Sequence, residues 1–549
     1  MEIIAESFSK KKVILFLVII SLSSLALKFT LTDFSSVPVQ DAYGYILHTI
    51  SITHGEFSEP PRKTLGWSFF ASSFFLLLNS NNFIDYVNTM RLLSLGISTI
   101  TIPIMYGLAR KFFSSKYSLV ASCLLAFEPH LNYIAGQGLS EPLYILALIL
   151  SFYFILDKKT SYLSFLFAGL VWWTRWPGMI MVLVISIVFF LNNKRSPKLF
   201  LRYLICIAIF LAVVSPMLIH RYEQYGDFMY FSLSNNFFSG DYGALLAENT
   251  KSESHTVKSY IENYGLLQFT NDFVFMGIIN IADQVFRMLF PYLIVLIPFG
   301  ILFSFRAFDQ NPKHIRANWI LIIVTLCGSV LSFSLINERR FLFYLYPFLV
   351  LFCTIPIQRL TQYGLSTFSY SERQKDFFLL GMMIIILIMS ALFAQRYVQD
   401  STIEDEKMKL AEFLLSKSDG KIILSNEDWR HGTFLKASNP EFFKDFTINY
   451  KENNSINELI GTPFTTLYAK SLEELLATGQ QYDLKYVVII QNDIEPWYDY
   501  LNNVYKNESE YPYLIKIYDS SEQGLQKLHV KAFEIDYEKW KSYKNTKNQ

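Results

Sequence analysis

Charged residues are scarce in this chain. Only 17% of its 549 residues are Asp, Glu, Lys or Arg, whereas a soluble domain carries about 25%. The formal net charge is +1, so the chain has no overall basic field that would support nucleic-acid binding. Cysteine is rarer still, and all four copies lie inside apolar runs: Cys123, Cys206, Cys327 and Cys353. This placement argues against a disulfide or zinc framework and indicates small core residues.

Apolar residues, in contrast, are abundant. Hydrophobic side chains make up 52% of the chain, and they gather in runs long enough to cross a bilayer. The first run, 13–32, follows three lysines and lacks a small-x-small cleavage site, so it predicts a retained anchor. Ten more runs lie at 90–109, 117–134, 139–156, 161–176, 177–192, 199–219, 284–305, 317–336, 341–357 and 376–395. We therefore expect about 11 transmembrane helices, although 161–192 also fits one re-entrant pair.

The distribution of Lys and Arg predicts the orientation of these spans. If the lysines at 10–12 are cytoplasmic, every basic loop falls on the same side: 110–116, 158–159, 194–198, 306–316 and 359–375. The opposite, outer side then receives the loop 33–89, the loop 220–283 and everything after about residue 396. The apolar stretch 64–78 is short, and a crossing there would invert every later loop, so we expect a helix along the outer interface.

Residues 397–549 differ in character, because charge rises and long apolar runs vanish. Helical patterns in EDEKMKLAEFLL and SLEELLATG alternate with strand patterns in KIILS, LKYVVIIQ, YLIKIY and LHVKAFEI. An alternating α/β domain fits this order. The expected fold is thus a mainly α, polytopic membrane domain (1–396), followed by a soluble, extracytoplasmic α/β domain (397–549).

Ionisable residues stand at the predicted outer ends of several spans, where each costs about 2.5–3.5 kcal/mol if it inserts. In chain order they are Asp41, Glu141, Arg175, His220-Arg221 and Glu338-Arg339-Arg340. Each has a simpler explanation: a helix cap or loop acid for Asp41, a dipole-stabilised helix start for Glu141, and interfacial snorkelling for the arginines. Their convergence on one membrane face favours a shared site.

Several short motifs follow one another in a recognisable order. Asp41 begins DAYGYILHTISITHG, and EPPRKTLGWSFF and NTMRLLSLGIS come next. Farther along the chain stand LSEPLYI, TRWPGMI, HRYEQYGDFMYFS and ERRFLFYLYPFL. This succession resembles the GT-C superfamily of membrane glycosyltransferases, in particular its protein O-mannosyltransferase and lipid A aminoarabinose transferase branch. Members of that superfamily use sugars carried on polyprenyl or dolichyl phosphate.

The resemblance implies a role for each site residue, with Asp41 as the catalytic base. The cations expected to hold the carrier phosphate are Lys63, which matches the family's phosphate-binding lysine, and Arg62, Arg91, Arg339 and Arg340. The residues expected to bind the sugar or the acceptor are Glu141, Arg175, Tyr45, His220 and Arg221. Ala42 and Tyr43 follow Asp41 where many relatives have a second acid, so we expect no bound metal and no other cofactor.

The expected reaction is transfer of a sugar from the lipid-phosphate carrier to a protein, lipid or glycan, by inverting single displacement on the extracytoplasmic face. The expected location is the cell membrane, or the endoplasmic reticulum membrane in a eukaryote. One alternative is an oligosaccharyltransferase, although its Trp-Trp-Asp motif is missing from the tail and WWTRW (172–176) lies in a span. A transporter or flippase of lipid-linked glycans is another, although no inverted repeat is evident. A receptor or assembly scaffold would leave the outer charges unexplained.

Overall fold

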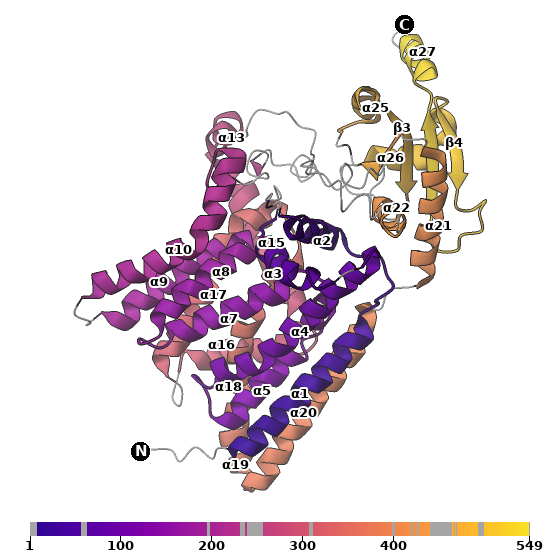
Figure 1. Ribbon diagram of the computed structural model, residues 1–549. Coiled ribbons are helices and arrows are strands. Elements are labelled where there is room, and N and C mark those ends of the chain that lie inside the picture. The colour runs from indigo at the N-terminus through magenta and orange to yellow at the C-terminus, as the bar shows by residue number, and fades with distance from the viewer. Residues whose placement is uncertain are drawn as a thin grey trace.

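The computed structural model is mainly helical and ends in a small sheet (Figure 1). It describes residues 8–55, 57, 63–78, 80–194, 198–230, 237–238, 256–306, 311–397, 401–418, 421–424, 428–439, 464–465, 467, 469–491 and 499–547. Most helices pack into one bundle, and the sheet with its own helices lies beyond one end of that bundle (Figure 1).

The first half of the bundle contains the helices that carry most of the predicted site. They are α1 (Lys10–Leu31), α2 (Gln40–Thr53), α3 (Gly66–Phe75), α4 (Phe83–Ala109), α5 (Ser115–Ala126), α6 (Pro129–Ala135), α7 (Glu141–Ile155), α8 (Ser161–Thr174), the 3-10 turn η1 (Trp176–Gly178), α9 (Met179–Asn193) and α10 (Leu199–Tyr225). Helix α7 packs against both α4 and α8. The segment 33–89, which the sequence predicted as an outer loop, contains helices α2 and α3 and the start of α4.

The second half of the bundle surrounds a fully buried helix. Its elements are α13 (Val257–Tyr264), α14 (Leu266–Phe269), the π-turn η2 (Thr270–Phe275), α15 (Met276–Met288), α16 (Leu293–Ser304), α17 (Pro312–Leu335), the 3-10 turn η3 (Arg339–Leu345), α18 (Tyr346–Arg359), the π-turn η4 (Leu360–Gly364), α19 (Leu365–Thr367), α20 (Glu372–Ala394) and the 3-10 turn η5 (Gln395–Tyr397). Every residue of α18 from Tyr346 to Gln358 is buried. A helix that is apolar on all sides forms the core of such a bundle.

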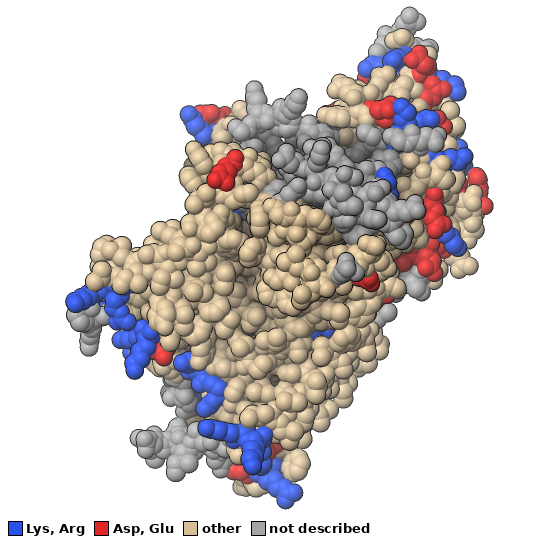
Figure 2. Space-filling model, viewed as in Figure 1, with Lys and Arg blue, Asp and Glu red and all other residues tan. Residues whose placement is uncertain are grey.

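The bundle has the surface of a multi-pass membrane protein. Among the described residues, seven helices are long and apolar enough to cross a bilayer, or eight if one bent pair counts as a span. The seven begin at Lys10, Phe83, Trp176, Leu199, Pro312, Arg339 and Glu372. On the face shown in Figure 2, a broad belt of the bundle carries almost no charge, and Lys and Arg gather at the end away from the sheet. Helices α7 and α8 are apolar but shorter.

Two of the expected spans are divided. The run 117–134 is split between α5 and α6, where the Glu128 side chain accepts a hydrogen bond from the Leu131 backbone N–H at 2.7 Å. The run 284–305 is split between α15 and α16, and its two parts are bent by 114°. A proline stands in each break, Pro129 and Pro291, and proline cannot donate the backbone hydrogen bond that would continue a helix.

The apolar stretch 64–78 forms the short helix α3, as the sequence predicted. Trp67 and Ala71 are buried on one side of α3, whereas Phe69 and Phe74 are exposed on the other. An exposed apolar face on a short helix fits a position at the membrane interface, which stays a prediction.

The tail contains the alternating elements that its sequence predicted. Its strands are β1 (Ile422–Leu424), β2 (Phe464–Thr465), β3 (Leu484–Ile490), β4 (Leu514–Asp519) and β5 (Val530–Ile535), in the order β2-β1-β3-β5-β4. Strands β2, β1 and β3 are parallel, whereas β5 runs antiparallel to β3 and β4. The helices are α21 (Ser401–Ser418), α22 (Asp428–Ala437), α25 (Leu472–Gln481), α26 (Asp499–Lys506), the 3-10 turn η7 (Glu508–Glu510) and α27 (Tyr537–Lys547).

The tail contacts the bundle close to the predicted site. The Tyr43 hydroxyl of α2 donates a hydrogen bond to the backbone carbonyl of Arg430 in α22 at 3.0 Å. Figure 1 shows α22 at the end of the bundle where α2 lies. Helix α2 of the bundle and helix α22 of the tail are therefore in direct contact.

Candidate active site

Asp41 lies in the first turn of α2, where the helix dipole favours an acid. Two cations from distant parts of the chain contact its carboxylate. Lys63 Nζ lies 3.4 Å from Oδ1, and Arg340 Nη1 lies 2.5 Å from Oδ2. The side chains of Asp41 and Arg340 are 33% and 27% exposed, so a ligand can reach this cluster from outside the protein.

Gly44 leaves open the space that the Lys63 ammonium occupies next to Asp41. Inside a helix, Gly is less favourable than Ala by about 0.5–1 kcal/mol, so a helical glycine calls for a reason. A Cβ on Gly44 would collide with Lys63 Nζ. The ammonium also donates a hydrogen bond to the Asp41 backbone carbonyl at 2.9 Å and lies 5.1 Å from the ring centre of Tyr45. Helix α2 thus surrounds this ammonium with a carboxylate, a carbonyl and an aromatic ring.

Glu141 and Arg175 form a second ion pair, and both side chains are mostly buried. Glu141 begins α7, and Pro142 follows in the first turn, where a missing backbone N–H costs the helix nothing. Arg175 is the residue at which α8 ends, with an extended backbone. The end of one helix and the start of its neighbour therefore bring these opposite charges together.

Phe341 joins the two ion pairs into one cluster. Its ring centre lies 5.2 Å from the guanidinium carbon of Arg175 and 5.2 Å from that of Arg340, within the range of cation–π attraction. Arg340 Nε also lies 2.6 Å from Glu338 Oε2. A small pocket between these groups is lined by Glu141, Tyr144, Ile145, Arg175, Pro177, Arg340, Phe341 and Tyr344.

The charges of this cluster balance. Three acids, Asp41, Glu141 and Glu338, meet three cations, Lys63, Arg175 and Arg340. A ligand that adds one anionic group must therefore compete with a carboxylate for the cations it contacts.

The electrostatic setting of Asp41 follows from these partners. Burial alone would raise the pKa of the Asp41 carboxyl, but the charges of Lys63 and Arg340 outweigh burial and hold that pKa well below its usual value. The carboxylate is therefore ionised at neutral pH. It is also a weak base while both cations hold it, because they stabilise its charged form.

Tyr45 contributes a hydroxyl at the edge of the cluster. Its oxygen lies 3.1 Å from Ser140 Oγ, next to Glu141 at the start of α7. Burial raises the pKa of Tyr45 to about 12, so the phenol stays protonated at neutral pH and can donate a hydrogen bond.

Arg339 points away from its neighbour Arg340. Its Nη1 lies 3.2 Å from His130 Nε2, and His130 Nδ1 lies 2.8 Å from Glu128 Oε1. Because arginine only donates, Nε2 accepts this hydrogen bond and Nδ1 carries the imidazole proton. Glu128 and His130 are both buried. The structure thus places Arg339, which is half-buried, in a second cluster that is closed at Glu128 and His130, and does not bring it to Asp41.

The other cations proposed from the sequence also lie outside the Asp41 cluster. Arg91 Nη2 donates to the Ser36 carbonyl at 2.9 Å, so it holds the segment between α1 and α2. Arg221 lies 4.2 Å from the Trp176 ring centre, and His220 Nδ1 is 3.9 Å from Glu223 Oε2. Arg62 lies outside the described residues.

A metal ion has no evident place among the residues that the structure describes. No three His, Cys, Asp or Glu side chains in those segments gather in the way that a metal site requires. Asp41 and Glu338 both contact Arg340, so a cation lies between these two acids.

Sequence reasoning missed four residues that contribute to these two clusters. Gly44 stood inside the quoted motif, and its signal was a glycine within a helical pattern. Phe341 follows the paired arginines, but nothing in the sequence shows that both guanidiniums contact it. Glu128 and His130 were hidden in the apolar run 117–134, where an acid two residues before a histidine was the available signal.

Part of the chain matches a model of a known protein family. Residues 63–220 match the family model described as dolichyl-phosphate-mannose-protein mannosyltransferase. The matched segment contains Lys63, Glu141 and Arg175. A search of curated protein sequences found no match.

Solved structures with a similar fold include an archaeal oligosaccharyltransferase and the bacterial protein ArnT. The oligosaccharyltransferase of Archaeoglobus fulgidus in the apo form is 12% identical, with a TM-score of 0.57, over 88% of this chain and 70% of that chain. ArnT from Cupriavidus metallidurans in the apo state is 10% identical, with a TM-score of 0.52, over 94% of this chain and 97% of that chain. This chain therefore shares its fold with these two proteins, and its residues 63–220 are similar to the dolichyl-phosphate-mannose-protein mannosyltransferase family.

Proposed function

We propose that this protein transfers a sugar from a polyprenyl- or dolichyl-phosphate carrier to a hydroxyl of a protein, lipid or glycan acceptor. The observation that carries the proposal is the convergence of Lys63 and Arg340 on Asp41. Two cations beside one carboxylate supply what such a transfer needs, namely charge stabilisation for a departing phosphate and a proton acceptor for the attacking hydroxyl.

Binding of the carrier phosphate exchanges the partners of these cations. The phosphate takes the place of the Asp41 carboxylate next to Lys63 and Arg340. The attraction between opposite charges increases as the distance between them decreases, so each cation is stabilised by the anion that lies nearest to it. Asp41 then loses the two charges that hold its pKa low, and it becomes a stronger base. The donor therefore activates the residue that receives the acceptor's proton.

The chemical step is a single displacement. The acceptor hydroxyl oxygen forms a bond to the anomeric carbon of the sugar while its proton passes to Asp41. The bond between that carbon and the phosphate oxygen breaks, and its electron pair leaves with the carrier phosphate, which gains one negative charge. Lys63 and Arg340 stabilise that charge, and each such donor contributes about 2.7–4 kcal/mol by analogy with oxyanion-hole deletions. Attack from the face opposite the phosphate inverts the anomeric centre.

The second ion pair serves the sugar and the acceptor. Glu141 and Arg175 line the pocket beside Arg340, and carboxylate and guanidinium groups are suited to hydrogen bonds with sugar hydroxyls. Tyr45, with its protonated hydroxyl, lies beside this pocket through its contact with Ser140. Arg91, Arg221, His220 and Arg339 support the elements around the site instead of contacting the phosphate.

The membrane arrangement fits this chemistry. A carrier lipid keeps its tail in the bilayer, so its phosphate must meet the protein where the apolar helices end. Asp41 lies beyond α1, and Glu141 lies at the start of α7. We place this end, and the tail that contacts it, on the extracytoplasmic side of a chain that crosses the membrane about 11 times, because the predicted inner loops carry the excess of Lys and Arg.

A related structure supports a lipid-phosphate ligand. AglB from Archaeoglobus fulgidus, in complex with an inhibitory peptide and a dolichol-phosphate, is 12% identical, with a TM-score of 0.52, over 87% of this chain and 69% of that chain. The fold therefore accommodates a lipid phosphate and an inhibitory peptide in that protein. Because AglB is an oligosaccharyltransferase with a similar fold, transfer of a whole oligosaccharide to asparagine is the second candidate function.

One experiment separates these functions. The purified protein is incubated with a panel of polyprenyl-phosphate monosaccharides and, separately, with a lipid-linked oligosaccharide and an asparagine-containing peptide. Release of the carrier phosphate is followed by mass spectrometry. We expect release from at least one monosaccharide donor, with an acceptor hydroxyl present. Turnover of the oligosaccharide donor alone would establish the second candidate, and turnover of neither would refute both.

A further inference from the structure

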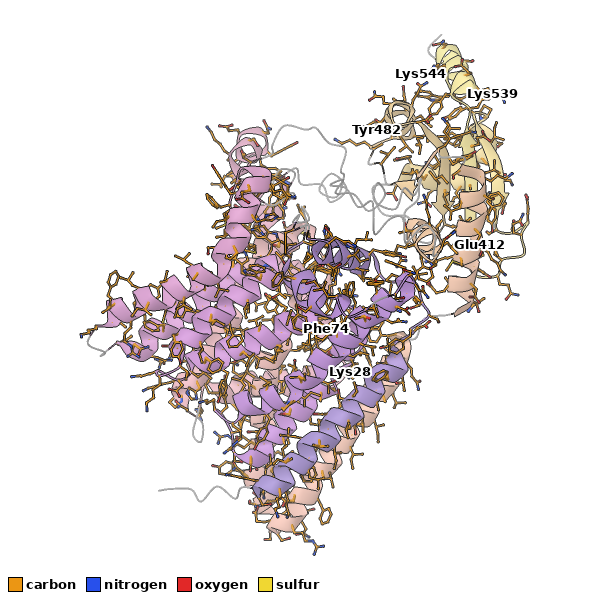
Figure 3. All side chains as sticks on the ribbon, in the orientation of Figure 1. Lys28, Phe74, Glu412, Tyr482, Lys539 and Lys544 are labelled. Carbon is orange, nitrogen blue, oxygen red and sulfur yellow. The ribbon has the colours of Figure 1, made fainter. Side chains whose placement is uncertain are left out.

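A second buried cation lies apart from the active site. Lys28 stands in the last turn of α1, among the helices of the bundle (Figure 3). It is 2% exposed, which is rare for a lysine without an ionic partner. Among the described residues, no carboxylate or hydrogen-bond acceptor contacts its ammonium, so this charge has no visible counter-ion.

The Lys28 side chain lines a pocket of about 370 Å³, including the part that is open to the surroundings. The walls come from five helices, and the lining residues are Lys28, Ser98, Thr101, Ile102, Leu125, Ala126, Leu131, Ile134, Pro142 and Ile145. Seven of these ten are apolar. The Thr101 hydroxyl donates to the Ile97 carbonyl at 2.8 Å, so its oxygen still presents lone pairs to the pocket.

An ammonium in such surroundings needs an anion. A charged group inside a membrane protein pairs with an opposite charge, faces water or serves a ligand. Lysines near the end of a span normally extend toward the interface, yet Lys28 is turned inward, where its four-carbon stem meets apolar walls. A pocket that is mostly apolar with a few convergent polar groups is the usual form of a ligand site.

We infer that the Lys28 pocket binds the anionic phosphate head of a membrane lipid. The ammonium supplies the charge, the hydroxyl side chains of Ser98 and Thr101 supply polar contacts, and the aliphatic walls hold the adjoining part of the lipid. Helix α1 exposes Ile19 and Leu22 on its outer side, so lipid surrounds the helix that carries Lys28. A lipid is therefore the nearest source of phosphate, and free phosphate is the alternative source.

This pocket is separate from the active site but shares a wall with it. Ile145 of α7 lines both pockets, and Pro142 on the Lys28 side follows directly after Glu141 on the catalytic side. The inference does not depend on the proposed transfer reaction, because it concerns a different set of side chains.

The test compares unfolding temperatures of the full-length protein in neutral detergent. Phosphatidylcholine, phosphatidylglycerol and inorganic phosphate are added separately. Wild type should gain several degrees with phosphatidylglycerol and much less with the other two additives. Lys28→Met should lose this gain, and without lipid it should unfold at or above the wild-type temperature, since an apolar side chain replaces an unpaired buried charge. Lys12→Met, at the exposed start of the same helix, should keep the gain.

Native mass spectrometry provides a second measurement that does not depend on unfolding. Wild type and Lys12→Met should retain one anionic lipid per chain more often than Lys28→Met. Should Lys28→Met fail to fold, Thr101→Val takes its place and should weaken the same lipid effect. Equal gains in wild type and Lys28→Met would overturn the inference. A gain with inorganic phosphate as large as that with lipid would overturn the lipid source.

Discussion

Two neighbouring arginines, Arg339 and Arg340, lie in clusters of opposite character. Arg340 meets Asp41, whose side chain is one-third exposed, and its partners can be replaced by a ligand that enters from outside. Arg339 meets the buried His130, which in turn contacts the buried Glu128. Its partners cannot change without leaving a buried polar group unsatisfied.

The difference shows what distinguishes a reactive cluster from a supporting one. Both contain an acid and an arginine, and both lie near the start of α18. The acid of the Asp41 cluster is accessible from outside, whereas Glu128, the acid of the Arg339 cluster, is buried. Under the proposed function, this access is the feature that would let a donor phosphate replace the carboxylate beside the cations.

Asp41→Asn should have the largest effect, because it removes the proton acceptor from the exchangeable cluster. We expect kcat to fall by about 10²–10⁴-fold, while the protein still inserts and can be purified. Donor turnover is measured by release of the carrier phosphate. Asp33→Asn is the matched control, since Asp33 is an acid of the same outer segment whose carboxylate accepts hydrogen bonds from Ser35. Near-normal turnover of Asp41→Asn would exclude it as the base.

Lys63→Ala should reduce kcat/KM for the donor by about 10²–10³-fold, because one of the two cations that stabilise the leaving phosphate is lost. The apparent donor affinity, from a titration of initial rates, should fall with it. Lys258→Ala is the control, since Lys258 is an exposed lysine that pairs with Glu262 on α13. Unchanged donor affinity in Lys63→Ala would assign the phosphate to another cation.

The two arginines test the comparison directly. Arg340→Gln should lower turnover by on the order of tenfold or more, with little change in unfolding temperature, because its cluster is partly exposed. Arg339→Gln should lower the free energy of unfolding by about 1–3 kcal/mol, since buried hydrogen-bond partners lose their donor. Turnover and thermal unfolding are measured on both variants. If the two effects were reversed, the closed cluster would be the reactive one.

Gly44→Ala should weaken donor binding by on the order of tenfold. The added methyl group displaces the Lys63 ammonium from its place beside Asp41. Since the end of a lysine side chain can move, we expect the loss in donor binding and little loss of stability. Gly96→Ala is the control, because a Cβ on Gly96 in α4 meets nothing within 4 Å. Initial rates over a range of donor concentrations separate the two variants. Equal donor affinity in both would show that Lys63 does not need the space beside Gly44.

The smallest effect concerns pH. Lys63 and Arg340 hold the pKa of Asp41 below its ordinary value, so its ion pairs stabilise the folded state fully above about pH 4 and lose that contribution as the pH falls further. Wild type should therefore lose unfolding temperature more steeply than Asp41→Asn below pH 4. Thermal unfolding between pH 3 and 7 measures the difference. Parallel curves for the two proteins would contradict the lowered pKa.

Much of the fold could be predicted from the sequence, because apolar runs of bilayer length and basic loops are strong local signals. Helix α1 coincides with the first run, and strands β1, β3, β4 and β5 of the tail lie at the patterns that predicted them, whereas the short strand β2 was missed. The breaks at Glu128 and Pro291 were missed, since the hydrophobicity of a run hides a short interruption inside it. The number of crossings stays a prediction for the same reason.

The site was predicted in part. Asp41, Lys63, Glu141, Arg175 and Arg340 were named from the sequence, and the structure brings them into one cluster. The sequence alone could not show that Arg339 and Arg91 lie outside this cluster, because the direction of a side chain depends on the turn that carries it. In the 3-10 turn η3, adjacent residues point to different sides, so two consecutive arginines reach different partners.

The hydrogen bond from Tyr43 to the backbone of Arg430 has a practical consequence for truncation experiments. Tyr43 follows Asp41 by two residues on a single helix, and its ring is fully buried. A shortened chain that ends before α22 would expose this ring to solvent and withdraw an acceptor from its hydroxyl. Truncation would thus disturb the helix that carries Asp41, and loss of turnover in such a fragment would not demonstrate that the tail recognises an acceptor.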